Sequence, residues 1–414
     1  MKKNSYRKIS QTFFILFVLV VGIHKSNYVI TELTGINIQS IIQISLLTFP
    51  LLFLFISYLF SSSRKISTRK NKDSFLVNII FFYVNILLLY GLIRGNNIAN
   101  IFLEYWTAII VLLSYKISTS EEIWSLFKGK LIIVFYIFTV LVLLGTRYTL
   151  VHLAEIGYDA VKPGGSTTGL LAYDMAPMLD FWPFLFLLGF FNKRIKKIRI
   201  LIYAPFVIYL LFQIFFLKRA PSVRAVSILI LASLIHMKLS GNNYAFIKQS
   251  FVFITIIIVG FLFTPEALMD RFETDDTSRQ DEFVGMLTEL NPLELVVGRG
   301  LGGYYYVQNG GVVQYINDDG KNVNSLLHIG VGYPILKGGF LFFFLIFYHI
   351  LKTVYRSLIR IKKLSIEELS CLVFLIVYSV FRLIEGPPSA GAIFDALLFG
   401  MSLGYLNRNI KPQF

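Results

Sequence analysis

Cysteine is almost missing from this sequence, and charged residues are scarce. The single cysteine, Cys371, lies inside an apolar run, which excludes an internal disulfide and a metal site built from several thiolates. Charged residues make up 15% of the 414 residues and hydrophobic residues 56%, whereas soluble domains have roughly 25% and 45–50%. The scarcity of charge, together with the apolar excess, excludes a water-soluble fold.

The short signatures of several common enzyme classes are also missing. There is no HExxH pair for zinc, no G-x-S-x-G nucleophile elbow and no P-loop lysine motif. The stretch Gly298–Gly303 has glycines at a GxGxxG-like spacing, but no predicted strand precedes it, so a dinucleotide site is rejected. We therefore expect no metal and no cofactor.

Apolar runs long enough to cross a bilayer dominate what is present. A membrane-spanning helix needs about 20 mostly apolar residues, and about a dozen runs approach that length. The expected fold is an all-α integral membrane protein in which residues 1–414 form a single polytopic domain. The predicted spans are 11–23, 41–60, 74–93, 98–115, 130–148, 171–191, 200–217, 221–236, 250–264, 330–351, 369–384 and 390–406.

Lys and Arg residues are concentrated in the segments on one predicted side of the membrane. A net charge of +15 would suit a nucleic-acid partner, but the basic residues fall in short clusters between the apolar runs. Twelve spans place both termini on one side, and that side carries 26 of the 39 Lys and Arg residues. Because short basic loops stay in the cytoplasm, we expect both termini there.

One segment on the predicted outer side, 265–329, is much longer than the others. Within it, Ser278 opens an S-x-x-D helix N-cap, and apolar residues follow at helical spacing up to Leu290. The Asn-Pro pair 291–292 is expected to end this amphipathic helix. The glycine stretch Gly298–Gly303 that follows is expected to be flexible.

Four arginines on the predicted outer side are candidate ligands for a lipid-linked phosphate, because the planar guanidinium is always charged and matches phosphate oxygens. Arg219 and Arg224 bracket a short outer turn, and Arg299 lies in the glycine stretch. The alternative role for Arg219 and Arg224 is that of interfacial anchors whose side chains reach to the headgroups.

The fourth arginine, Arg279, is expected at the first residue of the loop helix. A cation there opposes the helix dipole, at a cost of about 0.3–1 kcal/mol. Local pairing with Asp281 or Glu282 is one explanation for its position. The other is a bound diphosphate that meets both the guanidinium and the free backbone N–H groups of the helix N-terminus. Spacing alone leaves both explanations open.

His328 is the last polar side chain before the tenth predicted span, and it is a candidate general base because histidine titrates near neutral pH. A lone histidine at a span end is also often a structural hydrogen-bonding group. Asp174, Asp180 and Asp395 fall in or near spans, where ionisable groups are costly and often functional. Cations at the outer ends of spans are their alternative partners.

The order of elements in the second half of the chain is distinctive. A basic outer turn precedes a span, and a long outer loop then opens with Ser-Arg, continues to G-x-G and ends with a histidine and K-G-G before another span. The residues concerned are Lys218–Pro221, Ser278-Arg279, Asn291-Pro292, Gly298, Gly300, His328 and Lys337–Gly339. This order resembles the O-antigen polymerase and O-antigen ligase superfamily of bacterial surface polysaccharide assembly. Many members have His-Asn where this chain has His328-Ile329.

The resemblance implies a metal-independent glycosyltransferase whose donor is an undecaprenyl-diphosphate-linked oligosaccharide. The two functional arginines of the family correspond to Arg219, with Arg224 in reserve, and to Arg279, and they would hold and neutralise the leaving diphosphate. The family's histidine corresponds to His328, which would position or deprotonate the acceptor hydroxyl. Further expected contacts to the diphosphate or the sugar come from Arg224, Arg299, Tyr304 and Tyr305.

Three functions follow from the resemblance and the topology. The leading expectation is a polymerase of O-antigen or capsule repeat units in the bacterial cytoplasmic (inner) membrane, with an extracytoplasmic active site. The nearest alternative is an O-antigen ligase that transfers polymer to the lipid A core of lipopolysaccharide, and the alternative of another class is a flippase for lipid-linked sugars. Expected partners are lipid-linked oligosaccharides, the bilayer and, as a further candidate, a chain-length regulator, but no nucleic acid. The sugar and the type of cell envelope stay open.

Overall fold

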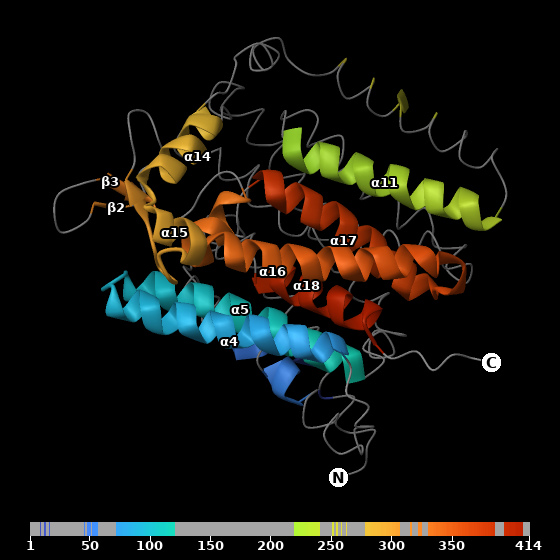
Figure 1. The fold of residues 1–414 in the computed structure, drawn as a ribbon. Helices are drawn as coiled ribbons and strands as arrows, with labels where there is room; N and C mark the ends of the chain where they lie inside the picture. The colour runs from blue at the N-terminus through green and yellow to red at the C-terminus, as the bar shows by residue number, and fades with distance from the viewer. Residues whose placement is uncertain are drawn as a thin grey trace, which may run out of the picture. The chain divides into compact units, whose positions relative to one another are not determined.

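The computed structural model describes residues 72–120, 219–240, 278–306, 315–316, 322–324, 330–385 and 393–408, together with isolated residues within 9–56 and 251–262. These residues are mostly helical (Figure 1). Three of the described helices are long and apolar enough to cross a membrane: Phe75–Ile93, Ile98–Thr119 and Gly332–Ile359. The described part is therefore mostly helical and compatible with an all-α membrane protein.

The chain divides into two compact units, and each is described by itself. The first unit comprises Met1–Ile66, Ser120–Arg271 and Lys362–Phe374. The second comprises Ser67–Thr119, Phe272–Ile361 and Leu375–Phe414 and holds most of the described residues. The first unit includes helix α11 (Arg219–Ser240), close to the predicted span 221–236.

Helices α4 (Lys72–Ile93) and α5 (Ile98–Ser120) form an antiparallel hairpin in the second unit and correspond to the predicted spans 74–93 and 98–115 (Figure 1). A tight turn joins them. Gly95 in this turn has a φ of 71°, a conformation that favours glycine. The side chain of Asn97 accepts a hydrogen bond from the N–H of Asn100 at 3.1 Å, which caps one of the free donors at the start of α5.

The part of the second unit that falls in the predicted outer segment 265–329 contains two short helices. Helix α14 (Ser278–Glu289) matches the predicted amphipathic helix. The Asn-Pro pair ends it as predicted, but it also starts helix α15 (Pro292–Val297). The Asn291 side chain accepts from the N–H of Glu294 at 2.9 Å and the Glu294 carboxylate accepts from the N–H of Asn291 at 3.2 Å, which is a capping box.

Three very short strands follow α15, and the sequence analysis predicted none of them. They are β1 (Tyr305–Tyr306), β2 (Tyr315–Ile316) and β3 (Asn322–Asn324). The order in the sheet is β1-β3-β2, with both pairs antiparallel. Tyr305 pairs with Asn324, so the end of β3 is held beside the residues that follow the glycine stretch.

Helix α16 (Gly332–Ile359) covers the predicted span 330–351 and extends beyond it. It is broken near its start, because Gly339 has a φ of 67° and a ψ of −176°. A Cβ atom at this position would lie 2.0 Å from the carbonyl oxygen of Val296, so a larger residue would collide with α15. The apolar run predicts the helix but not the break.

The last two helices are α17 (Ile366–Glu385) and α18 (Ile393–Leu406), close to the predicted spans 369–384 and 390–406. A single 3-10 turn, Ile361–Lys363, precedes α17. The remaining predicted spans lie outside the described residues apart from isolated positions, and they stay predictions: 11–23, 41–60, 130–148, 171–191, 200–217 and 250–264.

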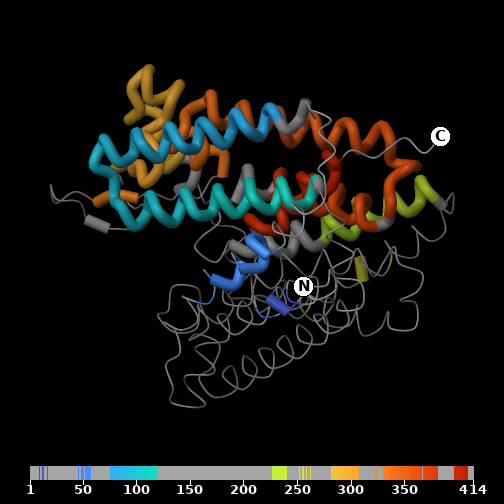
Figure 2. The backbone as a smooth tube through the Cα atoms, turned by 90° about the horizontal axis from the view of Figure 1, so that it is seen from below, coloured from blue at the N-terminus to red at the C-terminus, as the bar shows by residue number. Residues whose placement is uncertain are grey.

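Within the second unit, side-chain contacts define two ends of the helices. At the first, which we call the turn end, Arg94 pairs with Glu294 at 2.6 Å. Figure 2 shows the α4–α5 turn at this end, with the segment of α14 and α15 near it. At the second, which we call the opposite end, Asn407 donates to Thr353 at 2.8 Å and Arg360 donates to the carbonyl of Leu406. The predicted topology assigns the turn end to the extracytoplasmic side.

Candidate functional site

The stretch Gly298–Gly303, which we call the glycine turn, is packed rather than flexible, so the sequence-based expectation of flexibility is wrong. All of its residues except Arg299 are buried. Each of its six backbone N–H groups donates a hydrogen bond, which leaves no donor unsatisfied in the turn. In chain order the acceptors are the carbonyl oxygens of Glu294, Leu336, Lys337 and Leu87, the Glu104 carboxylate and the carbonyl oxygen of Gly300.

Close backbone contact with α4 explains a glycine in the middle of the turn. Gly300 has a φ of 81°, and a Cβ atom there would lie 2.6 Å from the backbone nitrogen of Gly91. On the other side of this contact, a Cβ atom at Gly91 would lie 2.3 Å from the carbonyl oxygen of Leu301. Two glycines facing each other therefore let the turn approach the helix backbone directly.

Arg299, a predicted contact to the diphosphate or sugar, is held by two carboxylates. Its guanidinium lies 2.6 Å from Glu289 and 3.3 Å from Glu294, and it also donates to the carbonyl oxygen of Tyr304 at 2.7 Å. The side chain is only 12% exposed. These contacts tie α14, α15 and the start of β1 together, so a phosphate at Arg299 would have to share or replace carboxylate partners. A role in substrate binding stays a prediction for this residue.

Glu294 is the centre of this charged group. Burial disfavours its ionisation, but the hydrogen bond from Arg94 and the backbone N–H of Asn291 outweigh burial and lower its pKa from the ordinary 4.5. The pKa of Arg94 is raised, since pairing with Glu294 outweighs the effect of burial there too. Arg94 was not among the residues predicted from the sequence. Its side chain is 35% exposed at the end of α4.

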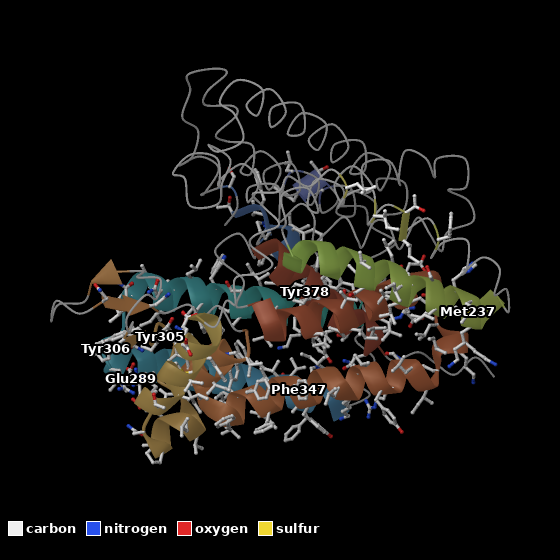
Figure 3. The ribbon with its side chains drawn as sticks, turned by 90° about the horizontal axis from the view of Figure 1, so that it is seen from above. Met237, Glu289, Tyr305, Tyr306, Phe347 and Tyr378 are labelled. Carbon is white, nitrogen blue, oxygen red and sulfur yellow. The ribbon has the colours of Figure 1, made fainter. Side chains whose placement is uncertain are left out.

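Tyr305 is buried, and its hydroxyl donates a hydrogen bond to the Glu282 carboxylate. Burial, followed by the neighbouring carboxylates of Glu282 and Glu289, raises the pKa of Tyr305 well above its ordinary value. The hydroxyl therefore stays protonated and is a donor at neutral pH. Figure 3 shows Glu289, Tyr305 and Tyr306 close together at the turn end, where the N–H of Tyr306 donates to Glu289 at 2.8 Å.

Tyr304, the other predicted tyrosine, differs from Tyr305 in exposure. It is half-buried, and its ring lies 5.9 Å from that of Tyr306 in an edge-to-face arrangement. Tyr304 precedes β1, and its ring contacts that of Tyr306, whereas Tyr305 between them is buried. The described geometry leaves Tyr304 the more accessible of the two predicted tyrosines for contact with a sugar.

The sequence analysis missed a buried ion pair between α5 and α16. Lys337 lies 2.7 Å from Glu104, and their side chains are only 1% and 7% exposed. A signal was present, because both residues fall inside predicted spans, where a charged side chain is rare and usually paired or functional. Aspartates near spans were among the candidates predicted from the sequence, but a pairing of this glutamate with this lysine was not predicted.

The predicted catalytic residues are only partly described. Arg219 and Arg224 lie in the first turns of α11 in the first unit, and Arg279 lies at the start of α14 in the second. The side chains of these arginines, and the whole of His328, lie outside the described residues. Their convergence on one substrate therefore stays a prediction.

Among the described residues, no group of three His, Cys, Asp or Glu side chains is arranged to hold a metal ion. The described carboxylates near the glycine turn instead have cations, tyrosine hydroxyls or backbone N–H groups as partners. The arrangement holds the turn between helices.

The chain matches no protein-family model, and no curated protein or solved structure is significantly similar to it.

Proposed function

We propose that this protein is a polymerase of undecaprenyl-diphosphate-linked oligosaccharide repeat units. The supporting observation is that charged and aromatic side chains gather at one end of apolar helices: α14, α15 and the glycine turn pack against the ends of α4, α5 and α16. A substrate whose sugar and diphosphate sit at the membrane surface while its lipid tail stays in the bilayer would meet the protein at such an end.

In this proposal the chain has twelve spans and its turn end faces the extracytoplasmic side of a bacterial cytoplasmic membrane. The excess of Lys and Arg in the segments on the other side supports this orientation. Donor and acceptor are both lipid-linked, so both reacting sugars would lie in the layer just outside the bilayer.

The proposed reaction is a glycosyl transfer without a metal. The acceptor hydroxyl oxygen bonds to the anomeric carbon of the donor sugar, the bond from that carbon to the diphosphate oxygen breaks, and undecaprenyl diphosphate leaves with the electron pair. Arg279 and Arg219, with Arg224 in reserve, would stabilise the charge that develops on the diphosphate. His328 would accept the proton of the acceptor hydroxyl.

The described residues suggest a division of roles within the outer segment. Arg299 pairs with Glu289 and Tyr305 donates to Glu282, so in this proposal both residues also shape the site. Tyr304 is the half-buried tyrosine that in this proposal contacts a sugar ring. Arg279 lies at the start of α14, where its guanidinium and the free backbone N–H groups of the helix would bind an anion together.

The test is polymer formation by purified protein in lipid nanodiscs. The substrate would be undecaprenyl-diphosphate-linked repeat units extracted from the source strain after deletion of this protein. We expect a ladder of chain lengths from the wild type, and no ladder from Arg279→Ala or Arg219→Ala. Lysine at either position should rescue poorly, because a point charge does not reproduce bidentate contact.

Arg356→Ala is the matched control, since Arg356 is an exposed arginine near the C-terminal end of α16. It should form wild-type ladders. Ladders of wild-type length from both Arg279→Ala and Arg219→Ala would contradict the site assignment. Two other outcomes would contradict the polymerase itself: transfer of preformed polymer to a lipid A core without elongation, or passage of labelled lipid across liposomes without elongation.

A further inference from the structure

The glycine turn lies alongside the spans rather than beyond their ends. The N–H of Leu301 donates to the carbonyl oxygen of Leu87 at 3.1 Å. Leu87 lies six residues before Ile93, the end of α4, which is a distance of about 9 Å at 1.5 Å a residue. Non-helical backbone therefore enters the bundle by more than one helical turn, at a depth where α4 is mostly apolar.

Irregular backbone at membrane depth is tolerated only where protein surrounds it and its polar groups are paired. The glycine turn meets both conditions. Its six N–H groups all donate, and the amide of Asn96 donates to the carbonyl oxygens of Arg299 and Leu301 at 2.9 and 2.8 Å. Leu301, which is 5% exposed, packs in one apolar cluster with Leu87 and Ile101.

The ion pair Glu104–Lys337 contacts the last two residues of this turn, Gly302 and Gly303. One carboxylate oxygen of Glu104 meets the Lys337 ammonium at 2.7 Å, and the other accepts the N–H of Gly302 at 2.7 Å. The same ammonium donates to the carbonyl oxygen of Gly303 at 2.5 Å. Two charges that would be costly in lipid are thereby used to fasten two consecutive residues of the turn.

We propose that Gly298–Gly303 is a re-entrant turn and that Glu104 and Lys337 form a latch that keeps it in place. Glu104 and Lys337 act as positioning residues, because only Tyr304 separates Gly303 from β1. Strand β1 pairs with β3, which ends four residues before His328. Release of the turn would displace Tyr304, the tyrosine proposed to contact the sugar, and the strands that lead to the histidine. This positioning role rests on the proposed function, whereas the latch itself does not.

The latch is tested by cysteine labelling, which needs no substrate. Leu301→Cys is made in a Cys371→Ala background, reconstituted in lipid nanodiscs and exposed to a membrane-impermeant maleimide. We expect slow labelling when the latch is intact. Lys337→Met, or Glu104→Gln, should raise the labelling rate about tenfold or more, because a turn that opens more often exposes its buried residue more often.

Two controls make the comparison specific. Ala99→Cys, at the exposed start of α5, should label at the same rate with and without the latch. Lys362→Met applies the same substitution to an exposed lysine and should leave labelling at residue 301 unchanged. If Lys337→Met fails to fold, the variant Glu104→Gln/Lys337→Met removes both charges together and should still label faster than the wild type.

Fast labelling of Leu301→Cys with the latch intact would overturn the re-entrant turn. An unchanged rate in the folded latch variants would overturn the latch. In the polymer assay, Glu104→Gln should lower kcat about tenfold and leave KM for the lipid-linked donor unchanged, because neither residue of the pair contacts the substrate. If the wild type forms no ladder, the proposed function fails while the labelling result still decides the latch.

Discussion

The two ends of the second unit place polar groups between apolar helices in different ways. At the turn end the polar groups are charged: Arg299 lies between Glu289 and Glu294, and Lys337 is paired with Glu104. At the opposite end the buried side-chain pair between helices is neutral, and the charged Arg360 donates to a backbone carbonyl, that of Leu406. Asn407 donates to Thr353, and the Thr353 hydroxyl donates to the backbone of its own helix at 2.8 Å.

Glycines also have different roles at the two ends. Those of the glycine turn permit positive φ angles and an irregular backbone, as at Gly300. Gly404 at the opposite end lies within regular helix, and a Cβ atom there would lie 2.3 Å from the carbonyl oxygen of Tyr115 on α5. Small residues at that end serve close helix packing. The comparison teaches that charge pairs shape an irregular segment here, whereas small and neutral residues join straight helices.

The largest loss of stability is expected from a substitution that disrupts the ion pair at the turn end. Lys337→Met leaves the Glu104 carboxylate buried without its cation, which should cost about 3–5 kcal/mol of stability. Removal of both charges in Glu104→Gln/Lys337→Met should recover much of that loss, because no uncompensated charge remains. Thermal unfolding of the purified protein measures both. A double variant that is less stable than the single one would contradict this account.

A smaller loss of stability is expected from a substitution at the opposite end. Thr353→Val keeps the shape of the side chain but removes the acceptor for Asn407, which should cost about 1 kcal/mol. Thr353→Ser keeps the hydroxyl and is the matched control. In the same thermal unfolding measurement, Lys337→Met should have a much lower melting temperature than Thr353→Val. Equal losses would remove the distinction between the ends.

The smallest effect is a pH dependence confined to the turn end. The pKa of Glu294 is lower in the folded protein than its ordinary 4.5, so its ionisation adds stability above that pH. This contribution is lost as pH falls through the folded pKa. Glu294→Gln should therefore flatten the fall in melting temperature below about pH 4.5, whereas Thr353→Val should keep the slope of the wild type. An unchanged slope in Glu294→Gln would contradict the assignment.

The helices of the second unit could be predicted because each depends on a local pattern. Continuous apolar runs produced spans that match α4, α5 and α16 at their starts to within two residues, and an N-cap pattern at Ser278 predicted α14. These patterns work because lipid forces backbone hydrogen bonds to close within each segment. The catalytic residues were proposed by resemblance, and they stay predictions.

What could not be predicted depends on partners distant in sequence. Glycines in a loop suggest freedom when read alone, yet the turn is immobilised by α4 and α16. The pairing of Arg299 with Glu289 and Glu294 was not predicted from the sequence, and the role of Arg299 as a phosphate ligand stays a prediction. The pairing of Glu104 with Lys337 joins residues that no local pattern connects, and only their position in apolar runs hinted at it.

The sequence by itself determined that this is a helical membrane protein and where most of the described helices lie, because apolar length and backbone hydrogen bonding are local properties of a segment. Tertiary structure alone decided that Gly298–Gly303 enters the bundle and that Glu104 and Lys337 fasten it. Buried charges and irregular backbone are stable only when partners from other helices pair with the charges and with the backbone polar groups. Those partners come together only in the folded protein.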